Sequence, residues 1–210
     1  MVMVISVDGG VMESCTMTSK LRRLFNGQSI APLFVLLTAS AAWAAPGVSI
    51  RFHGESTLHG FDGHAETADV HMEETPEGVG RIVATVSVPT MTTDHAARDR
   101  RMAAMFDAAT FPILTGSATA ADLVAATDGS TMPLDVVIAG HTNTLTATCR
   151  VIPGEAADGG ASREWSFPVS LRAFGLKAPS VIGLIRVSDT VEVTARLNAE
   201  AWNMVNEGAR

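Results

Sequence analysis

Residues 144–151 read Thr-Leu-Thr-Ala-Thr-Cys-Arg-Val, so an apolar or small side chain stands at every second position. Successive side chains of a β-strand point to opposite faces of a sheet, and this period of two is therefore typical of a strand with one buried and one solvated face. The same alternation recurs in residues 48–52, 81–88, 165–172 and 191–197, and less regularly in 65–73, 113–125 and 132–139. The pattern predicts an all-β, antiparallel fold of about eight strands.

Turn residues separate these runs, at Pro76-Glu77-Gly78, Thr127-Asp128-Gly129 and Asp158-Gly159-Gly160. Connections this short are typical of hairpins that join neighbouring antiparallel strands. Pro168 lies inside one of the runs and has no backbone N–H to donate. We therefore expect a bulge or a locally open edge at Pro168.

One segment departs from the alternation. Thr93-Asp94 offers a helix N-cap, and Met102, Met105 and Phe106 follow at helical spacing. We expect a helix over residues 94–108 that ends before Pro112 and covers one mouth of the sheet. Arg98 and Asp99 are expected to tie this helix and the preceding loop to the sheet through charge-assisted hydrogen bonds. A contact of Arg98 with a ligand head group is the alternative.

Eight alternating strands can close into a barrel or stack as a two-layer sandwich. Several inward positions carry small side chains, which favours a barrel with space along its axis: Ala84, Ala147, Cys149 and Ala195. In the alternative, these residues interdigitate with large ones across a filled core. Cys149 is expected to be inert packing.

The N-terminal region is typical of a targeting segment. Basic residues at 20, 22 and 23 precede a short apolar run at 30–37, and Ala42-Trp43-Ala44 supplies a small-x-small cleavage pattern. We expect a signal peptide over residues 1–44, with Met17 as an alternative start. The alternative is an N-terminal membrane anchor, which Pro32 and the cleavage pattern disfavour.

The mature chain is then one domain, residues 45–210. It has no second apolar stretch of membrane-spanning length, so we expect no stable membrane insertion after signal removal. The formal net charge of the full chain is −7, and no basic cluster stands in the mature part. Nucleic acid is therefore not an expected partner. Cys149 is the one thiol left after cleavage, which excludes an intramolecular disulfide.

Three stretches, in sequence order, form a recognisable pattern. The first is Ser56-Thr57-Leu58-His59-Gly60-Phe61-Asp62-Gly63. The second runs from Val88-Pro89-Thr90 through Arg98-Asp99 and Phe106-Asp107-Ala108 to Phe111-Pro112. The third comprises Phe167-Pro168-Val169-Ser170-Leu171, Phe174-Gly175-Leu176 and Val187-Ser188-Asp189. Together the three stretches resemble the YceI-like family of lipid-binding proteins. The chain departs from the family pattern at Leu58-His59 and at Ile138-Ala139-Gly140-His141-Thr142.

The resemblance implies a periplasmic, lipocalin-like barrel of eight strands, with one short helix covering an end. It also implies an apolar tunnel that holds a polyisoprenoid-type lipid, such as the tail of an isoprenoid quinone, as a bound ligand and not a cofactor. No catalytic step is implied, and the protein is expected to be a monomer or homodimer. The candidate tunnel residues are Phe52, Val86, Phe106, Leu134, Leu145, Trp165, Phe167, Val169 and Val193.

Metal and catalytic sites have little support. Four histidines lie close together in the chain, at positions 53, 59, 64 and 71, and a hairpin loop at residues 60–63 would make His59 and His64 face each other. Two imidazoles do not complete a zinc site, which takes three or four ligands. The sequence has no Gly-x-Ser-x-Gly or His-Glu-x-x-His motif. We therefore expect neither a metal site nor a catalytic residue.

Two other function classes stay open. A ligand-free β-domain that serves as an interaction module in envelope stress would have a filled interior and an exposed apolar patch. An enzyme acting on an apolar substrate would have a polar group of perturbed pKa inside its pocket.

Overall fold

The structure is a computed structural model that describes residues 47–65, 68–76, 79–154, 160–181 and 185–208, all within the unit Ala39–Arg210. The expected signal peptide, its cleavage after Ala44 and the alternative start at Met17 lie outside the described residues. So do Glu77-Gly78 and Asp158-Gly159, which belong to two of the expected turns.

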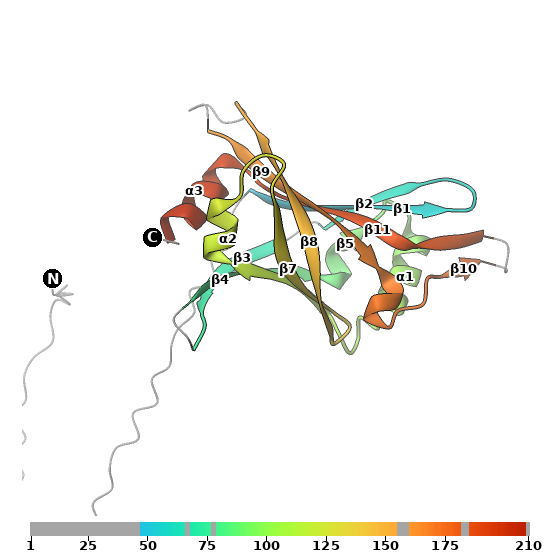
Figure 1. Ribbon diagram of the computed structural model, residues 1–210. Helices are drawn as coiled ribbons and strands as arrows, with labels where there is room; N and C mark the ends of the chain where they lie inside the picture. The colour runs from blue at the N-terminus through green and yellow to red at the C-terminus, as the bar shows by residue number, and fades with distance from the viewer. Residues whose placement is uncertain (1–46, 66–67, 77–78, 155–159, 182–184, 209–210) are drawn as a thin grey trace, which may run out of the picture. The chain divides into compact units, whose positions relative to one another are not determined.

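The described residues form one antiparallel sheet of eleven strands (Figure 1). The strands are β1 (Val48–Ser56), β2 (Phe61–Ala65), β3 (Ala68–Glu74), β4 (Gly80–Ser87), β5 (Met91–Thr92), β6 (Ile113–Thr119), β7 (Thr131–Ile138), β8 (His141–Ile152), β9 (Ser162–Ser170), β10 (Ser180–Val181) and β11 (Ile185–Leu197). Their hydrogen-bonded order is β3-β4-β6-β7-β8-β9-β11-β1-β2-β5, and β10 pairs with β11 outside this path. The sheet curls, because β3 at one end of the path approaches β1 near the other.

Three α-helices and two 3₁₀-helices accompany the sheet within the described part: α1 (Ala96–Met105), α2 (Ala120–Ala125), α3 (Ala199–Gly208), η1 (Val88–Thr90) and η2 (Leu171–Phe174). Figure 1 shows α1 at one end of the sheet and α2 with α3 at the opposite end. We call these the α1 end and the α3 end. None of the helices in the described ranges has the length and apolar character that a membrane crossing requires.

The all-β, antiparallel prediction is confirmed, whereas the expected count of eight strands and one helix is wrong. The candidate strand at 65–73 is divided, because Ala65 pairs with β1 and β5 while residues from Ala68 onward pair with β4. In the described residues the ladder is an open path from β3 to β5 and not a closed ring.

The candidate strand at 113–125 ends at Thr119, where α2 begins. The Thr119 side chain accepts a hydrogen bond from the Asp122 backbone N–H and donates one to the Asp122 carboxylate. This reciprocal cap stabilises a helix start and was readable from the spacing of the two residues. Helix α3, which the sequence analysis missed, begins similarly: the Asn198 side chain accepts from the Ala201 N–H at 2.9 Å.

The expected helix at 94–108 exists as the shorter α1, and the predicted Thr93-Asp94 cap is wrong. His95 occupies the N-cap position and its side chain makes no capping bond. Asp94 instead takes a left-handed backbone conformation, with φ of 57°. The threonines before the helix bind Asp99 within its first turn, as described below.

Pro168 lies where the sequence predicted a local opening. The ladder between β8 and β9 ends at Ser166, so the missing N–H of Pro168 leaves no gap in it. On its other side β9 stays paired with β11, with Pro168 opposite Glu192. This is the edge-like position that a proline requires in a strand.

Candidate functional site: an apolar cavity inside the curled sheet

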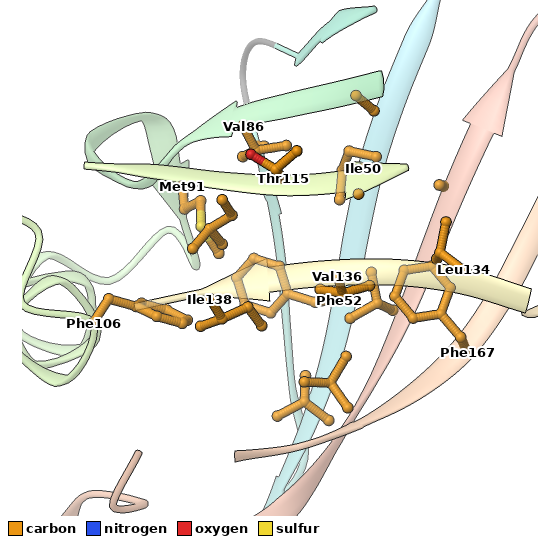
Figure 2. Close-up of a pocket in the computed structure, with 18 of the residues that line it drawn as sticks. Ile50, Phe52, Val86, Met91, Phe106, Thr115, Leu134, Val136, Ile138 and Phe167 are labelled. Atoms are coloured by element: carbon orange, nitrogen blue, oxygen red, sulfur yellow. The ribbon is translucent and has the colours of Figure 1, made fainter. Parts of the chain in front are cut away.

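The inner face of the sheet encloses a cavity of about 390 Å³, a size within the usual range for small-molecule sites. Its walls come from most of the long strands, from α1 and from Leu123 of α2. In Figure 2, Phe52, Val136, Ile138 and Phe167 point into one shared space, with Phe106 at the α1 side. The lining is almost entirely hydrocarbon, so the space suits an apolar occupant.

Two aromatic rings of the lining lie over glycines on the paired strand. Phe52 is directly opposite Gly63, and Phe61 is directly opposite Gly54. A Cβ atom at either glycine would overlap the ring opposite it. Gly54 and Gly63, the second of which belongs to the first family-like stretch, therefore let the two rings lie against the backbone of the β1–β2 hairpin and form one wall of the cavity.

Small side chains give the cavity its width. Ala84, Ala147 and Ala195 line it as the alternation predicted, and Gly116, which lies opposite Ala84 in the ladder, adds to them. A Cβ at Gly116 would meet only the Leu134 side chain, at 4.0 Å. A larger side chain at Gly116 would therefore extend from the backbone without an immediate clash.

Eight of the nine candidate tunnel residues line the cavity: Phe52, Val86, Phe106, Leu134, Trp165, Phe167, Val169 and Val193. Leu145 does not line it and packs against the hydrophobic core, although it shares the inward phase of β8 with Ala147. Sequence reasoning missed Ile50, Val136 and Ile138, which lie on the same inward phase as residues it did select. Their alternation was the signal that could have found them.

Toward the α3 end, the wall of the cavity is backed by aromatic packing. Trp202 of α3 is 7% exposed and its ring centroid is 6.0 Å from that of Trp165. The Arg163 guanidinium lies over the Trp202 ring, 4.0 Å from the ring centroid. Trp165 and Phe167 therefore form walls of a hollow and do not fill it along its depth.

The α1 end is held by polar bonds. The Asp99 carboxylate accepts hydrogen bonds from the Thr93 backbone N–H, the Thr93 hydroxyl and the Thr92 hydroxyl, at 2.9, 2.6 and 3.0 Å. Burial acts to raise the pKa of Asp99, but the bonds from Thr93 and Thr92 outweigh it and hold that pKa below its ordinary value. The expected tie through Asp99 is confirmed.

Arg98 acts differently from the expectation. Its guanidinium lies over the Phe61 ring, 4.7 Å from the centroid, which joins α1 to the β1–β2 hairpin by a cation–π contact. Arg98 also lines the cavity.

The expected arrangement of the histidines is wrong. The β1–β2 connection spans residues 57–60, so His59 lies in the turn while His64 pairs with Arg51 along the strands. His53 forms hydrogen bonds with Glu55 and Asp62. Both bonds raise the pKa of His53, and the bond with Glu55 has the larger effect. Within the described ranges, no three potential ligands from His, Cys, Asp and Glu come together as a metal site.

Three further titratable side chains of the described residues have shifted pKa values, and none of the three lines the cavity. Burial raises the pKa of the Cys149 thiol, which is 1% exposed and does not line the cavity. Asp135, whose pKa is lowered by Thr144 and Arg81, and Asp189, whose pKa is lowered by Ser170 and the Arg172 N–H, also lie outside the lining. The polar group that an enzyme would use on a bound apolar molecule is therefore not found among these residues.

The profile of the YceI-like domain matches residues 40–199, most of the chain. The chain belongs to the YceI-like family. A search among curated proteins gave no match.

Among solved structures, this YceI-like chain is similar to BcnA of Burkholderia cenocepacia, with a TM-score of 0.54, 17% identity, and coverage of 71% of this chain and 94% of BcnA. At that identity the likeness shows a shared fold. A polyisoprenoid binding domain from Saccharophagus degradans gives a TM-score of 0.49, 16% identity and coverage of 76% and 97%. The YCEI protein of Campylobacter jejuni gives a TM-score of 0.47, 16% identity and coverage of 65% and 82%.

Proposed function

We propose that this YceI-like protein binds a long apolar lipid of isoprenoid type inside the curled sheet, and carries or sequesters it in the periplasm without catalysing a reaction. The observation that carries the proposal is the hollow, hydrocarbon-lined interior. A domain that binds no ligand is expected to have a core filled by side chains, because close packing stabilises the fold. The alternative of a ligand-free interaction module requires a filled interior, which the inner face does not have.

The lining favours binding through area and not through polar recognition. Each Å² of apolar surface removed from water contributes about 25 cal/mol. A chain-like hydrocarbon can bury most of its surface between Phe52, Val136 and Phe167. Selectivity among tails should therefore depend on length and width, and tails of related shape should bind comparably.

The test is mass spectrometry of the protein purified from the periplasm of its own cells. Native spectra should show the polypeptide, beginning at Ala45, with an apolar adduct that organic extraction releases. A bare polypeptide under non-denaturing conditions would contradict the proposal.

Two variants locate the adduct. Ala147→Trp places an indole in the cavity and should abolish the adduct, whereas Thr146→Trp changes the neighbouring, solvent-exposed position of β8 and should keep it. Because Ala147 is fully buried, Gly116→Phe serves as a second blocking variant at a site with steric room. An adduct retained in both folded blocking variants would place the lipid elsewhere.

A further inference from the structure

The cavity lining is basic at one end. Among the described residues that line it, four have basic side chains: His59, His95, Arg98 and Arg101. We call these four the basic rim. None of the described lining residues is an aspartate or glutamate, although the whole chain has a net charge of −7. The acidic residues of the described part therefore lie outside the cavity lining, whereas the lining contains basic residues.

All four residues of the basic rim belong to the α1 end. His59 lies in the β1–β2 turn, and the others lie on α1 or at its N-cap. The contact between Arg98 and Phe61 brings the turn and the helix together. His59, His95 and Arg101 are exposed and Arg98 is half-buried, so this end meets solvent. The α3 end offers instead a neutral donor, the buried Trp165 Nε1, which has no hydrogen-bond partner in the described part.

Three carboxylates at this end, those of Asp99, Glu55 and Asp62, bind other residues. Asp99 accepts its three bonds from Thr92 and Thr93, while Glu55 and Asp62 bind His53. Asp99 interacts with Arg98 at longer range, through charge alone. Neither Arg98 nor Arg101 takes part in an ion pair with a carboxylate of the described residues. The two guanidinium groups therefore keep donors for another anion.

We infer that the ligand of this cavity is an amphiphile with one anionic head, a phosphate or a carboxylate, held by the basic rim while its apolar tail lies along the sheet. This inference rests on the proposed function and adds the polarity and the direction of the ligand. Guanidinium groups suit both heads, because their planar N–H donors match paired oxygens. A neutral head would leave the charge of the basic rim without a partner.

The test compares farnesyl phosphate with farnesol, which share a tail and differ in the head. Calorimetric titration of the delipidated protein in phosphate-free buffer at 0.15 M salt limits the effect of distant charges. The phosphate should bind about tenfold more tightly than the alcohol, as expected for charge-assisted hydrogen bonds that are partly solvated. Inorganic phosphate alone, at the same concentrations, should give no saturable heat.

Arg101→Gln and Arg100→Gln form a matched pair. Both residues are exposed on α1 and carry the same charge, but only Arg101 lines the cavity. Arg101→Gln should remove most of the preference for farnesyl phosphate over farnesol, whereas Arg100→Gln should keep that preference.

Three results would overturn the inference. Equal binding of the two ligands, equal losses in the two variants, or binding of inorganic phosphate as tight as that of farnesyl phosphate would each do so while the apolar cavity still binds farnesol. If neither farnesyl compound binds, the proposed function fails together with the inference.

Discussion

The two ends of the sheet are built from different interactions. At the α3 end, Trp165 of the cavity lining packs against Trp202, and both side chains are buried. At the α1 end, a partly exposed helix is held by hydrogen bonds to Asp99 and by the contact of Arg98 with Phe61. Aromatic packing makes a permanent wall, whereas a short helix held by a few polar bonds can separate locally from the sheet at lower cost. We therefore expect the ligand of the proposed function to enter and leave at the α1 end.

The largest expected change in the free energy of unfolding comes from a substitution at the α3 end. Trp202→Ala should lower the free energy of unfolding by about 3 to 5 kcal/mol, because it leaves a cavity beside Trp165. Met102→Ala, at a half-buried lining position of α1, should cost less than half as much. Urea denaturation measures both. Similar losses in the two variants would show that the ends do not differ in packing.

An intermediate effect is expected from the polar tie at the α1 end. Asp99→Asn should lower stability by about 1 to 3 kcal/mol at pH 7, since it weakens bonds to a charged acceptor. The folded pKa of Asp99 is lowered, so its contribution is present above the unfolded pKa of about 4 and is lost as pH falls through the folded pKa. The difference from wild type should therefore shrink in acid.

Asp94→Asn is the control for this change. Asp94 is exposed and has a left-handed backbone, which asparagine tolerates well, so stability should not change measurably. If Asp99→Asn were as neutral as Asp94→Asn, or if its cost persisted unchanged well below pH 4, the proposed tie would be wrong.

The smallest effect concerns Cys149, which pairs with Trp165 toward the α3 end. Cys149→Ala should change stability by only about 1 kcal/mol. The native thiol should react slowly with a disulfide reagent, because burial raises its pKa and restricts access. Thr148→Cys in the Cys149→Ala background places a thiol at the exposed neighbouring position and should react quickly. Equal rates would show that the α3 end opens readily.

Alternation in the sequence selected eight residues that line the cavity, because the period of two assigns each residue to one face of its strand. It could not predict that Leu145 lies on the inward face yet outside the cavity, since this depends on which other elements cover that part of β8. The local sequence determines to which face of the strand a side chain points, whereas the elements that pack over that face depend on the tertiary structure.

The basic rim shows the same limit more strongly. His59 and Arg101 are far apart in sequence, and the contact of Phe61 with Arg98 that joins their segments belongs to the folded chain. The hairpin turn was predicted at 60–63 and lies at 57–60, which places His59 in the turn and His64 opposite Arg51. A small error in the predicted position of a turn shifts the register of the paired strands, and the register decides which side chains meet.

A crystal structure of the delipidated protein soaked with farnesol would test the hollow sheet most directly. We expect continuous density for the hydrocarbon between Phe52, Val136 and Phe167, with the hydroxyl end toward α1. An interior in which Trp165, Phe167 and their neighbours meet and exclude the ligand, or density on the outer face alone, would contradict the account.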